Sequence, residues 1–146
     1  QLYAKDAPQN VNAFVFLAQQ GYYDNLTWHR VLQGFMAQTG DPLGSGMGGP
    51  GFTTSLEVVP TLKYDKPGVI GMARAQDPNS AGSQFFITFQ PVPQLDPSPQ
   101  TQGYTIIGQL VEGLDVLNKI KFRDPSANPN FTGDPLVSIR VVDVVG

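Results

Sequence analysis

Two short stretches of the chain combine large apolar side chains with a few hydrogen-bonding ones. Residues 28–38 read WHRVLQGFMAQ, and residues 82–88 read GSQFFIT. The polar groups set among the apolar ones are Arg30, Gln38 and Gln84. This mixture is typical of strands that line an apolar pocket equipped with hydrogen-bond donors. The two stretches therefore predict a binding pocket.

The segments around these stretches make the pattern more specific. Ala7-Pro8 precedes a predicted helix, GYYD follows it at residues 21–24, and the sequence continues with Gly40-Asp41, the glycines of 46–49 and PGVIGMARA at 67–75. Together these segments closely resemble cyclophilins, the peptidyl-prolyl cis-trans isomerases, from about Leu2 to the end of the chain. A resemblance of this length and order is far more specific than any single motif, but activity is a separate question from family.

The reaction that this resemblance implies needs no nucleophile, metal or cofactor. Rotation about an amide must cross a barrier of about 18–20 kcal/mol, because resonance flattens the C–N bond. When the bond twists, the lone pair of the prolyl nitrogen localises and can accept a hydrogen bond. A guanidinium aimed at that nitrogen then stabilises the transition state more than the ground state. The resemblance assigns this catalytic role to Arg30.

The resemblance also implies a set of substrate-binding residues. An apolar pocket for proline would be formed by Phe35, Met36, Phe86 and Leu95, with Tyr104 where many members carry histidine. Gln38 and Gln84 would hold the backbone that precedes the proline. Extended peptide would bind along Ala73, Arg74 and Ala75, largely through main-chain groups. Arg74 replaces the common asparagine.

Taken singly, these residues have ordinary structural interpretations. Phe35, Phe86 and Leu95 would be core residues, the two glutamines would satisfy buried backbone groups, and Arg30 would pair with a surface acid. The joint spacing favours the functional interpretation. His29 points to the opposite strand face from Arg30 by alternation, so we expect a packed structural histidine. The face occupied by Trp28 is left open.

The elements that must position these residues follow from spacing. Val11, Phe14, Val15 and Ala18 predict a helix over residues 8–20, and a short helix is predicted over 114–121. Strands are predicted over 27–32, 35–38, 68–72, 85–89, 105–110 and 137–144. Closure would protect the edges of so many short strands. With the resemblance, this predicts an eight-stranded antiparallel closed β-barrel capped by two α-helices, its first strand shortened or missing because the chain starts almost at that strand's end.

Three glycine-rich or proline-rich segments are predicted to be loops. Residues 90–103 resemble an insertion beside the pocket, and residues 123–135 form a second proline-punctuated connection. Residues 40–51 contain six glycines but lack the GxxxxGK[ST] and GxGxxG phosphate-binding patterns. A turn and gate beside the pocket is the better interpretation.

Composition bounds the remaining possibilities. The 146 residues fit a single domain over 1–146. A net charge of -3 disfavours nucleic acid as a partner, and the absence of cysteine with only one histidine disfavours metal sites. Apolar runs are too short to span a membrane. We expect a monomer, and composition leaves open whether it is cytoplasmic or exported to the cell envelope.

Two functions remain in competition. The first is an isomerase that acts on X-Pro bonds in unfolded or flexible protein segments and so assists folding. The second is a noncatalytic chaperone or binding module that holds proline-containing segments in the same groove. Arg30 favours the enzyme, and a small-ligand β-barrel carrier is disfavoured because side chains normally fill so small a barrel. We also expect only weak cyclosporin binding, because Gln94 stands where many members carry tryptophan.

Overall fold

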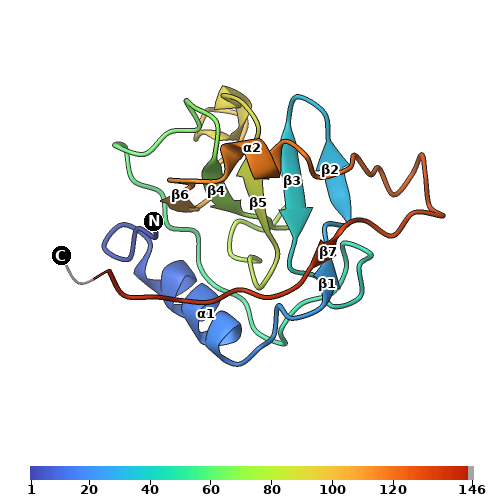
Figure 1. The fold of residues 1–146 in the computed structure, drawn as a ribbon. Coiled ribbons are helices and arrows are strands. Elements are labelled where there is room, and N and C mark those ends of the chain that lie inside the picture. Colours follow the sequence, from blue (N-terminus) through green and yellow to red (C-terminus); the bar gives the residue numbers. More distant parts are fainter. Residues whose placement is uncertain (145–146) are drawn as a thin grey trace.

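The computed structural model describes residues 1–144 and shows a mainly β protein with two α-helices (Figure 1). In chain order the elements are α1 (Pro8–Gln19), β1 (Leu26–Thr27), β2 (Arg30–Leu32), β3 (Met36–Thr39), β4 (Val69–Met72), β5 (Phe85–Thr88), the 3₁₀ turn η1 (Pro93–Leu95), β6 (Ile106–Gln109), α2 (Leu114–Leu117) and β7 (Pro135–Leu136). This confirms the predicted fold class at the level of mainly β with two helices.

The strands form two antiparallel sheets. The larger has the order β2-β3-β5-β4-β6, and β1 pairs with β7 in the smaller. Single bridges extend both edges of the larger sheet, because Leu2 pairs with Gly108 and Arg123 pairs with Val31. Among the described residues the strands number seven, and the ladders between them do not close into a barrel.

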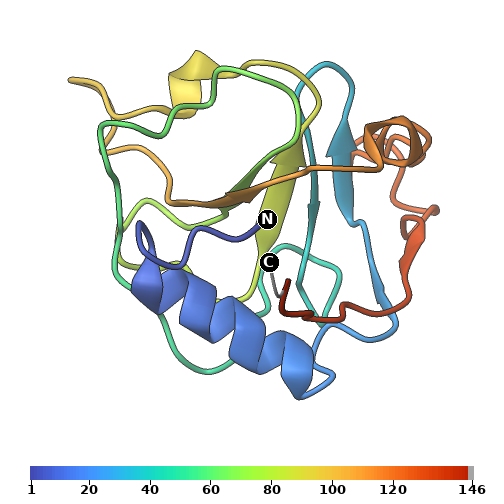
Figure 2. The same ribbon diagram turned by 60° about the vertical axis from the view of Figure 1, so that its left-hand side comes forward.

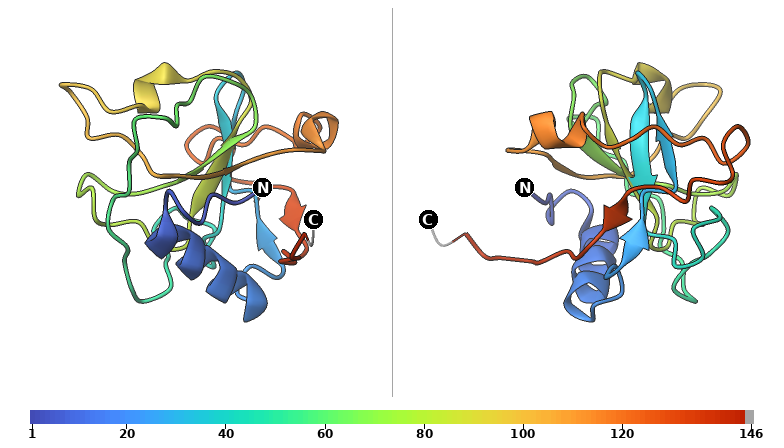
Figure 3. Two further views of the ribbon diagram at one scale, coloured as in Figure 1. Left: turned by 90° about the vertical axis from the view of Figure 1, so that its left-hand side faces the viewer. Right: turned by 45° about the vertical axis from the view of Figure 1, so that its right-hand side comes forward.

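The larger sheet packs on both of its faces. Directly paired residues share a face, and successive residues of a strand alternate between faces. Phe85 of β5 therefore belongs to the core that contains α1, while Phe86 belongs to a second cluster with Met36 and Tyr64. Figures 2 and 3 show α1 below the strands and η1 at the opposite end of the molecule.

Helix α1 forms where its apolar spacing predicts. Pro8 sits in the first turn, where its missing N–H costs no hydrogen bond, and Gly21 follows the end with φ +73°. The ring of Phe14 meets Phe85 edge-on, with centroids 5.2 Å apart. This contact ties the helix to the middle of the sheet and confirms the predicted helix to within one residue.

Three predicted elements differ from the structure: the strand over residues 27–32, the helix over residues 114–121 and the strand over residues 137–144. The run over residues 27–32 is two strands, because the N–H of Trp28 donates to Asp134 while that of Val31 donates to Arg123. The predicted helix over residues 114–121 stops at Leu117 and continues as tighter i→i+3 turns.

The predicted strand over residues 137–144 is wrong. The final strand is β7, at Pro135–Leu136, and residues 137–144 continue from it without ladder pairing. Ile139 and Val141 are half-buried against the α1 core. Their alternation therefore reflects one-sided packing of an extended segment. Among the described residues, we find no helix with the length and apolar character needed to cross a lipid bilayer.

Candidate active site

One row of paired residues crosses the sheet on the face opposite α1. Arg30 of β2 pairs with Gln38 of β3, Gln38 with Phe86 of β5, and Phe86 with Gly71 of β4. Because paired residues share a face, the sheet register itself places the arginine, the glutamine and the phenylalanine together. The strand pairing thus accounts for the spacing of the two sequence stretches.

A cavity of about 180 Å³ opens on this face. Its walls are formed by Arg30, Phe35, Met36, Gln38, Ala73, Arg74, Phe86, Leu95 and Tyr104. All nine were predicted site residues. The other two, Ala75 and Gln84, line an adjoining cavity that shares Gln38 and Arg74 with the first. The structure therefore gathers the whole predicted set along two neighbouring cavities that share wall residues.

Phe86 forms one wall of the cavity and packs against two other aromatic rings. Its ring stacks on Tyr64 at 5.8 Å between centroids and meets Tyr104 edge-on at 6.3 Å. The Tyr64 hydroxyl donates to the carbonyl of Tyr104 at 3.0 Å, and burial raises the pKa of Tyr64 well above its usual value. Gly71 makes room for this stack, because a Cβ there would lie 2.5 Å from Cζ of Phe86.

Sequence reasoning assigned no role to Tyr64 or Gly71. Tyr64 lies outside both signature stretches, and Gly71 looks like an ordinary strand residue. The one available signal was a glycine inside a predicted strand, which often marks a close approach of another group.

Polar side chains form a linked rim beside the apolar wall. Arg30 Nη1 donates to Gln38 Oε1 at 3.5 Å, and Gln38 Nε2 donates to Gln84 Oε1 at 2.9 Å. Gln84 Nε2 in turn donates to the carbonyls of Gly46 and Gly48 at 3.0 and 2.9 Å. Because the contact from Arg30 is long, the rim orients its guanidinium without tightly engaging it.

A buried carboxylate organises the glycine-rich loop that holds Gln84. Asp41 accepts hydrogen bonds from the N–H groups of Leu43, Ser45 and Gly46 at 2.8, 2.9 and 2.6 Å. Burial works to raise the pKa of Asp41, but these backbone donors outweigh it and hold the pKa below its usual value. The loop lines the adjoining cavity of about 740 Å³, so it lies beside the pocket as predicted.

The segment that carries Ala73, Arg74 and Ala75 is held at both ends. The N–H of Ala73 donates to the Gln84 carbonyl at 3.0 Å, and the N–H of Ala75 donates to Ser80 Oγ at 2.9 Å. The Arg74 guanidinium lies 4.4 Å from the centre of the Tyr104 ring. The segment therefore forms a fixed border between the apolar pocket and the cavities beside it.

The two residues that precede Arg30 in the chain, Trp28 and His29, are buried. Burial lowers the pKa of His29, and the charges of Arg123 and Arg30 lower it further, against an opposing effect of Asp41. His29 is 1% exposed, in agreement with a structural histidine. Trp28, whose face the sequence left open, packs in the α1 core against Phe85 at 6.2 Å.

These features define a mainly β protein with a small apolar pocket whose rim carries one oriented arginine and two glutamines. The model of the protein family described as "Cyclophilin type peptidyl-prolyl cis-trans isomerase/CLD" matches residues 1–144. A peptidyl-prolyl cis-trans isomerase of Helicobacter pylori is 45% identical over 126 residues, covering 85% of this chain and 74% of the relative. Peptidyl-prolyl cis-trans isomerase-like 1 of Aspergillus niger is 37% identical, covering 100% of this chain and 89% of the relative.

A solved structure shows the same likeness. The cyclophilin type peptidyl-prolyl cis-trans isomerase of Cryptosporidium parvum, crystallised in the presence of the dipeptide Ala-Pro, is 40% identical with a TM-score of 0.74. The match covers 81% of this chain and 74% of that one. The chain belongs to the cyclophilin-type peptidyl-prolyl cis-trans isomerases, which confirms the resemblance found in the sequence.

Proposed function

We propose that this enzyme rotates X-Pro bonds in unfolded or flexible protein segments at the 180 Å³ cavity, with Arg30 as the catalytic residue. The observation that carries the proposal is the register row, which puts the Arg30 side chain on the same face of the sheet as Phe86. Proline fits such a site because its ring is compact and apolar. Phe35, Met36, Phe86 and Leu95 would contact the ring, and Tyr104 would close one side.

Arg30 would act by differential binding. In the planar amide the prolyl nitrogen cannot accept a hydrogen bond, whereas in the twisted amide it can, so the guanidinium stabilises the transition state selectively. Acceleration by about five decades requires about 7 kcal/mol. A charged hydrogen bond contributes about 1.5–3 kcal/mol. The shape of the pocket must therefore supply much of the remainder by favouring the twisted form.

The remaining predicted residues would align the peptide. Gln38 and Gln84 carry the side-chain amides that would bind the backbone preceding the proline, and their mutual hydrogen bond at 2.9 Å presets their orientation. Ala73, Arg74 and Ala75 would receive the peptide in extended form along their main chain. Such preorganisation lowers the ordering cost of binding a flexible client.

We also infer the finer architecture from the edges of the sheet. The inferred architecture is an eight-stranded closed β-barrel capped by the two helices, in a single domain over residues 1–146. The bridges at Leu2 and Arg123 support it, because each adds backbone pairing beyond an edge of the larger sheet. The N–H of Tyr3 donates to the Ile107 carbonyl at 2.8 Å, which supports a shortened first strand beside β6.

The competing proposal is a holding module that binds proline segments without rotating them. An isomerisation assay on a short X-Pro peptide separates the two, with peptide-induced shifts of NMR signals read on the same samples. We expect acceleration in proportion to protein concentration, and shifts at Phe86 and Met36. Shifts without acceleration would favour the holding module, and shifts confined to other residues would contradict the pocket assignment.

A further inference from the structure

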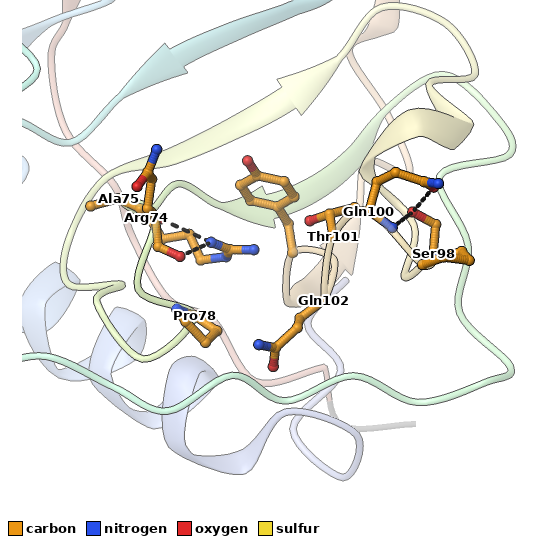
Figure 4. A pocket seen from close by; sticks show the side chains of 10 residues that line it. Arg74, Ala75, Pro78, Ser98, Gln100, Thr101 and Gln102 are labelled. Atoms are coloured by element: carbon orange, nitrogen blue, oxygen red, sulfur yellow. Dashed lines mark hydrogen bonds between the residues drawn. The ribbon is translucent and has the colours of Figure 1, made fainter.

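A third cavity lies against the proposed proline pocket and shares its Arg74 and Tyr104 walls (Figure 4). Its volume is about 770 Å³. One side is formed by Arg74, Ala75, Gln76 and Pro78, and the other by residues 98–102 of the loop predicted as an insertion. Figure 4 shows the Arg74 side chain reaching from its own segment toward the 98–102 loop, with Pro78 and Gln102 on either side below it. The inserted loop thus lines a cavity beside the apolar pocket.

The Arg74 guanidinium is fixed in place by neutral partners. Its Nε and Nη2 atoms donate to the Gly103 carbonyl at 3.1 and 2.7 Å, and Nη1 donates to the carbonyls of Ala75 and Gln76 at 2.9 and 3.2 Å. A guanidinium has five N–H groups, so one N–H on Nη2 is left over. Stacking on Tyr104 fixes the plane of the group further.

The charge of this region differs in sign from that of the whole chain. The chain carries a net charge of -3. Among the described residues, the linings of the proline pocket and the two adjoining cavities contain Arg30 and Arg74 and no aspartate, glutamate or lysine. The charged side chains that line these cavities are therefore cationic on an acidic protein, a distribution that draws anionic groups toward them. Asp77, between Gln76 and Pro78, is exposed and lies outside the linings.

We propose that the cavity beside Arg74 is a specificity subsite for an acidic side chain of the client, within about two residues of the proline. This inference rests on the proposed isomerase function, because the proline anchors the peptide next door. An extended chain advances about 3.3 Å per residue, so a residue close to the proline reaches the shared wall. A carboxylate can accept the remaining Nη2–H and pair with the charge, without displacing the carbonyl contacts of Arg74.

A purely structural role for Arg74 makes a different prediction. Its bonds to Gly103 brace the inserted loop against the 73–76 segment, so loss of the brace would affect all peptides equally. A specificity role affects acidic peptides selectively. The discriminating quantity is a ratio of rates for two peptides on one protein sample, in which changes in folded fraction cancel.

The experiment compares kcat/KM for two sets of peptides that differ only by Glu or Gln at each of the two positions on either side of a single proline. We expect the unmodified protein to prefer a Glu peptide about fivefold at low salt in at least one position. At 1 M salt, where the Debye length is about 3 Å, the ratio should approach one. Arg74→Gln should bring it to one at low salt, and Arg74→Lys should retain part of it.

Arg140→Gln is the matched control, because it removes one positive charge from an exposed residue outside all three cavities. It should keep the preference. A ratio of one for every pair in the unmodified protein overturns the inference, as does a preference that survives in Arg74→Gln. If no peptide is isomerised, the proposed function fails. The same Glu and Gln peptides, titrated for binding, then still test the subsite.

Discussion

Neighbouring residues of one strand belong to opposite faces of the five-stranded sheet, and the two faces differ in how closely they are packed. Phe85 and Phe86 are adjacent in β5, and each is 4% exposed. Phe85 is enclosed by the rings of Phe14, Tyr23 and Trp28, whereas one side of Phe86 lines a cavity. The core against α1 therefore encloses Phe85 with aromatic rings, whereas the core on the other face leaves one side of Phe86 open to the cavity of the candidate active site.

The two faces are also covered by different means. Helix α1 covers the first with a continuous apolar stripe. The second is covered by loops, each fixed by a few side chains: Tyr64 hydrogen-bonds to the carbonyls of Tyr104 and Thr105 just before β6, and Asp41 organises the glycine-rich loop. Substitutions on the first face should therefore change stability, and substitutions on the second should change activity.

The adjacent phenylalanines give the strongest test of this division. Phe85→Ala should lower the free energy of unfolding by about 3–5 kcal/mol, because it opens a cavity among packed rings. Phe86→Ala should cost less stability, because its ring already borders a cavity, but should weaken peptide binding and slow turnover. Urea unfolding and the isomerisation assay, corrected for folded fraction, measure both. Equal effects of the two substitutions on corrected turnover would contradict the division.

Arg30 and Val31 repeat the comparison on β2. Arg30→Ala should slow isomerisation by about a hundredfold or more, with the thermal midpoint nearly unchanged. Lysine should rescue poorly because it lacks the planar fork. Val31→Ala, on the core face at 1% exposure, should lower the midpoint and leave turnover of the folded protein intact. A near-normal rate for Arg30→Ala would remove this residue from the mechanism.

Cyclosporin tests the rim of the open face. Gln94 is exposed and lies outside the lining of the proline pocket. Because glutamine cannot replace the apolar face of an indole, the drug should inhibit weakly, and Gln94→Trp should tighten inhibition by about tenfold through added aromatic contact and an N–H donor. Titration into the isomerisation assay measures both. Tight inhibition of the unmodified protein with no gain from tryptophan would show that the inserted loop compensates.

The smallest effect concerns pH. Because burial lowers the pKa of His29 in the folded protein, the unfolded chain binds the proton more readily below about pH 6.5. Stability should be complete above that pH and fall on acidification from 6.5 to 5, by at most about 1.4 kcal/mol per pH unit.

His29 is the chain's one histidine, so His29→Gln should flatten the slope in this window. Urea midpoints measured across the pH range test this prediction. The control is the range above pH 6.5, where the two proteins should show parallel profiles. An unchanged slope in the variant would assign the proton to another group.

The part of the fold that the sequence predicts best is the location of the central strands, because the strands predicted over residues 35–38 and 85–89 correspond to β3 and β5. The resemblance assigned Gln38 and Phe86 to one site, and the pairing of β3 with β5 sets these two residues directly opposite each other. The break at Trp28 was not predictable, because it depends on a partner more than 100 residues away at Asp134.

Tyr64, which supports the pocket wall, was not predicted for the same reason. Tyr64 acts through the Tyr104 and Thr105 carbonyls, which no local spacing connects to it. The strand expected at 137–144 failed because alternation reports one-sided burial and says nothing of a ladder partner. The resemblance thus identified residues that line the cavity, whereas the residues that support them depend on long-range hydrogen bonds that local pattern does not reveal.

The interleaving of the two faces along β3 and β5 also bears on protein engineering. Met36, Gln38 and Phe86 face the open side, and Ala37 and Phe85 between them face the helix. A library that varies only the even-numbered positions would explore substrate range while leaving the packing against α1 intact. A library that varies the odd-numbered positions would search for thermostability with the groove unaltered. Two paired four-residue strands thereby offer two nearly separable design problems.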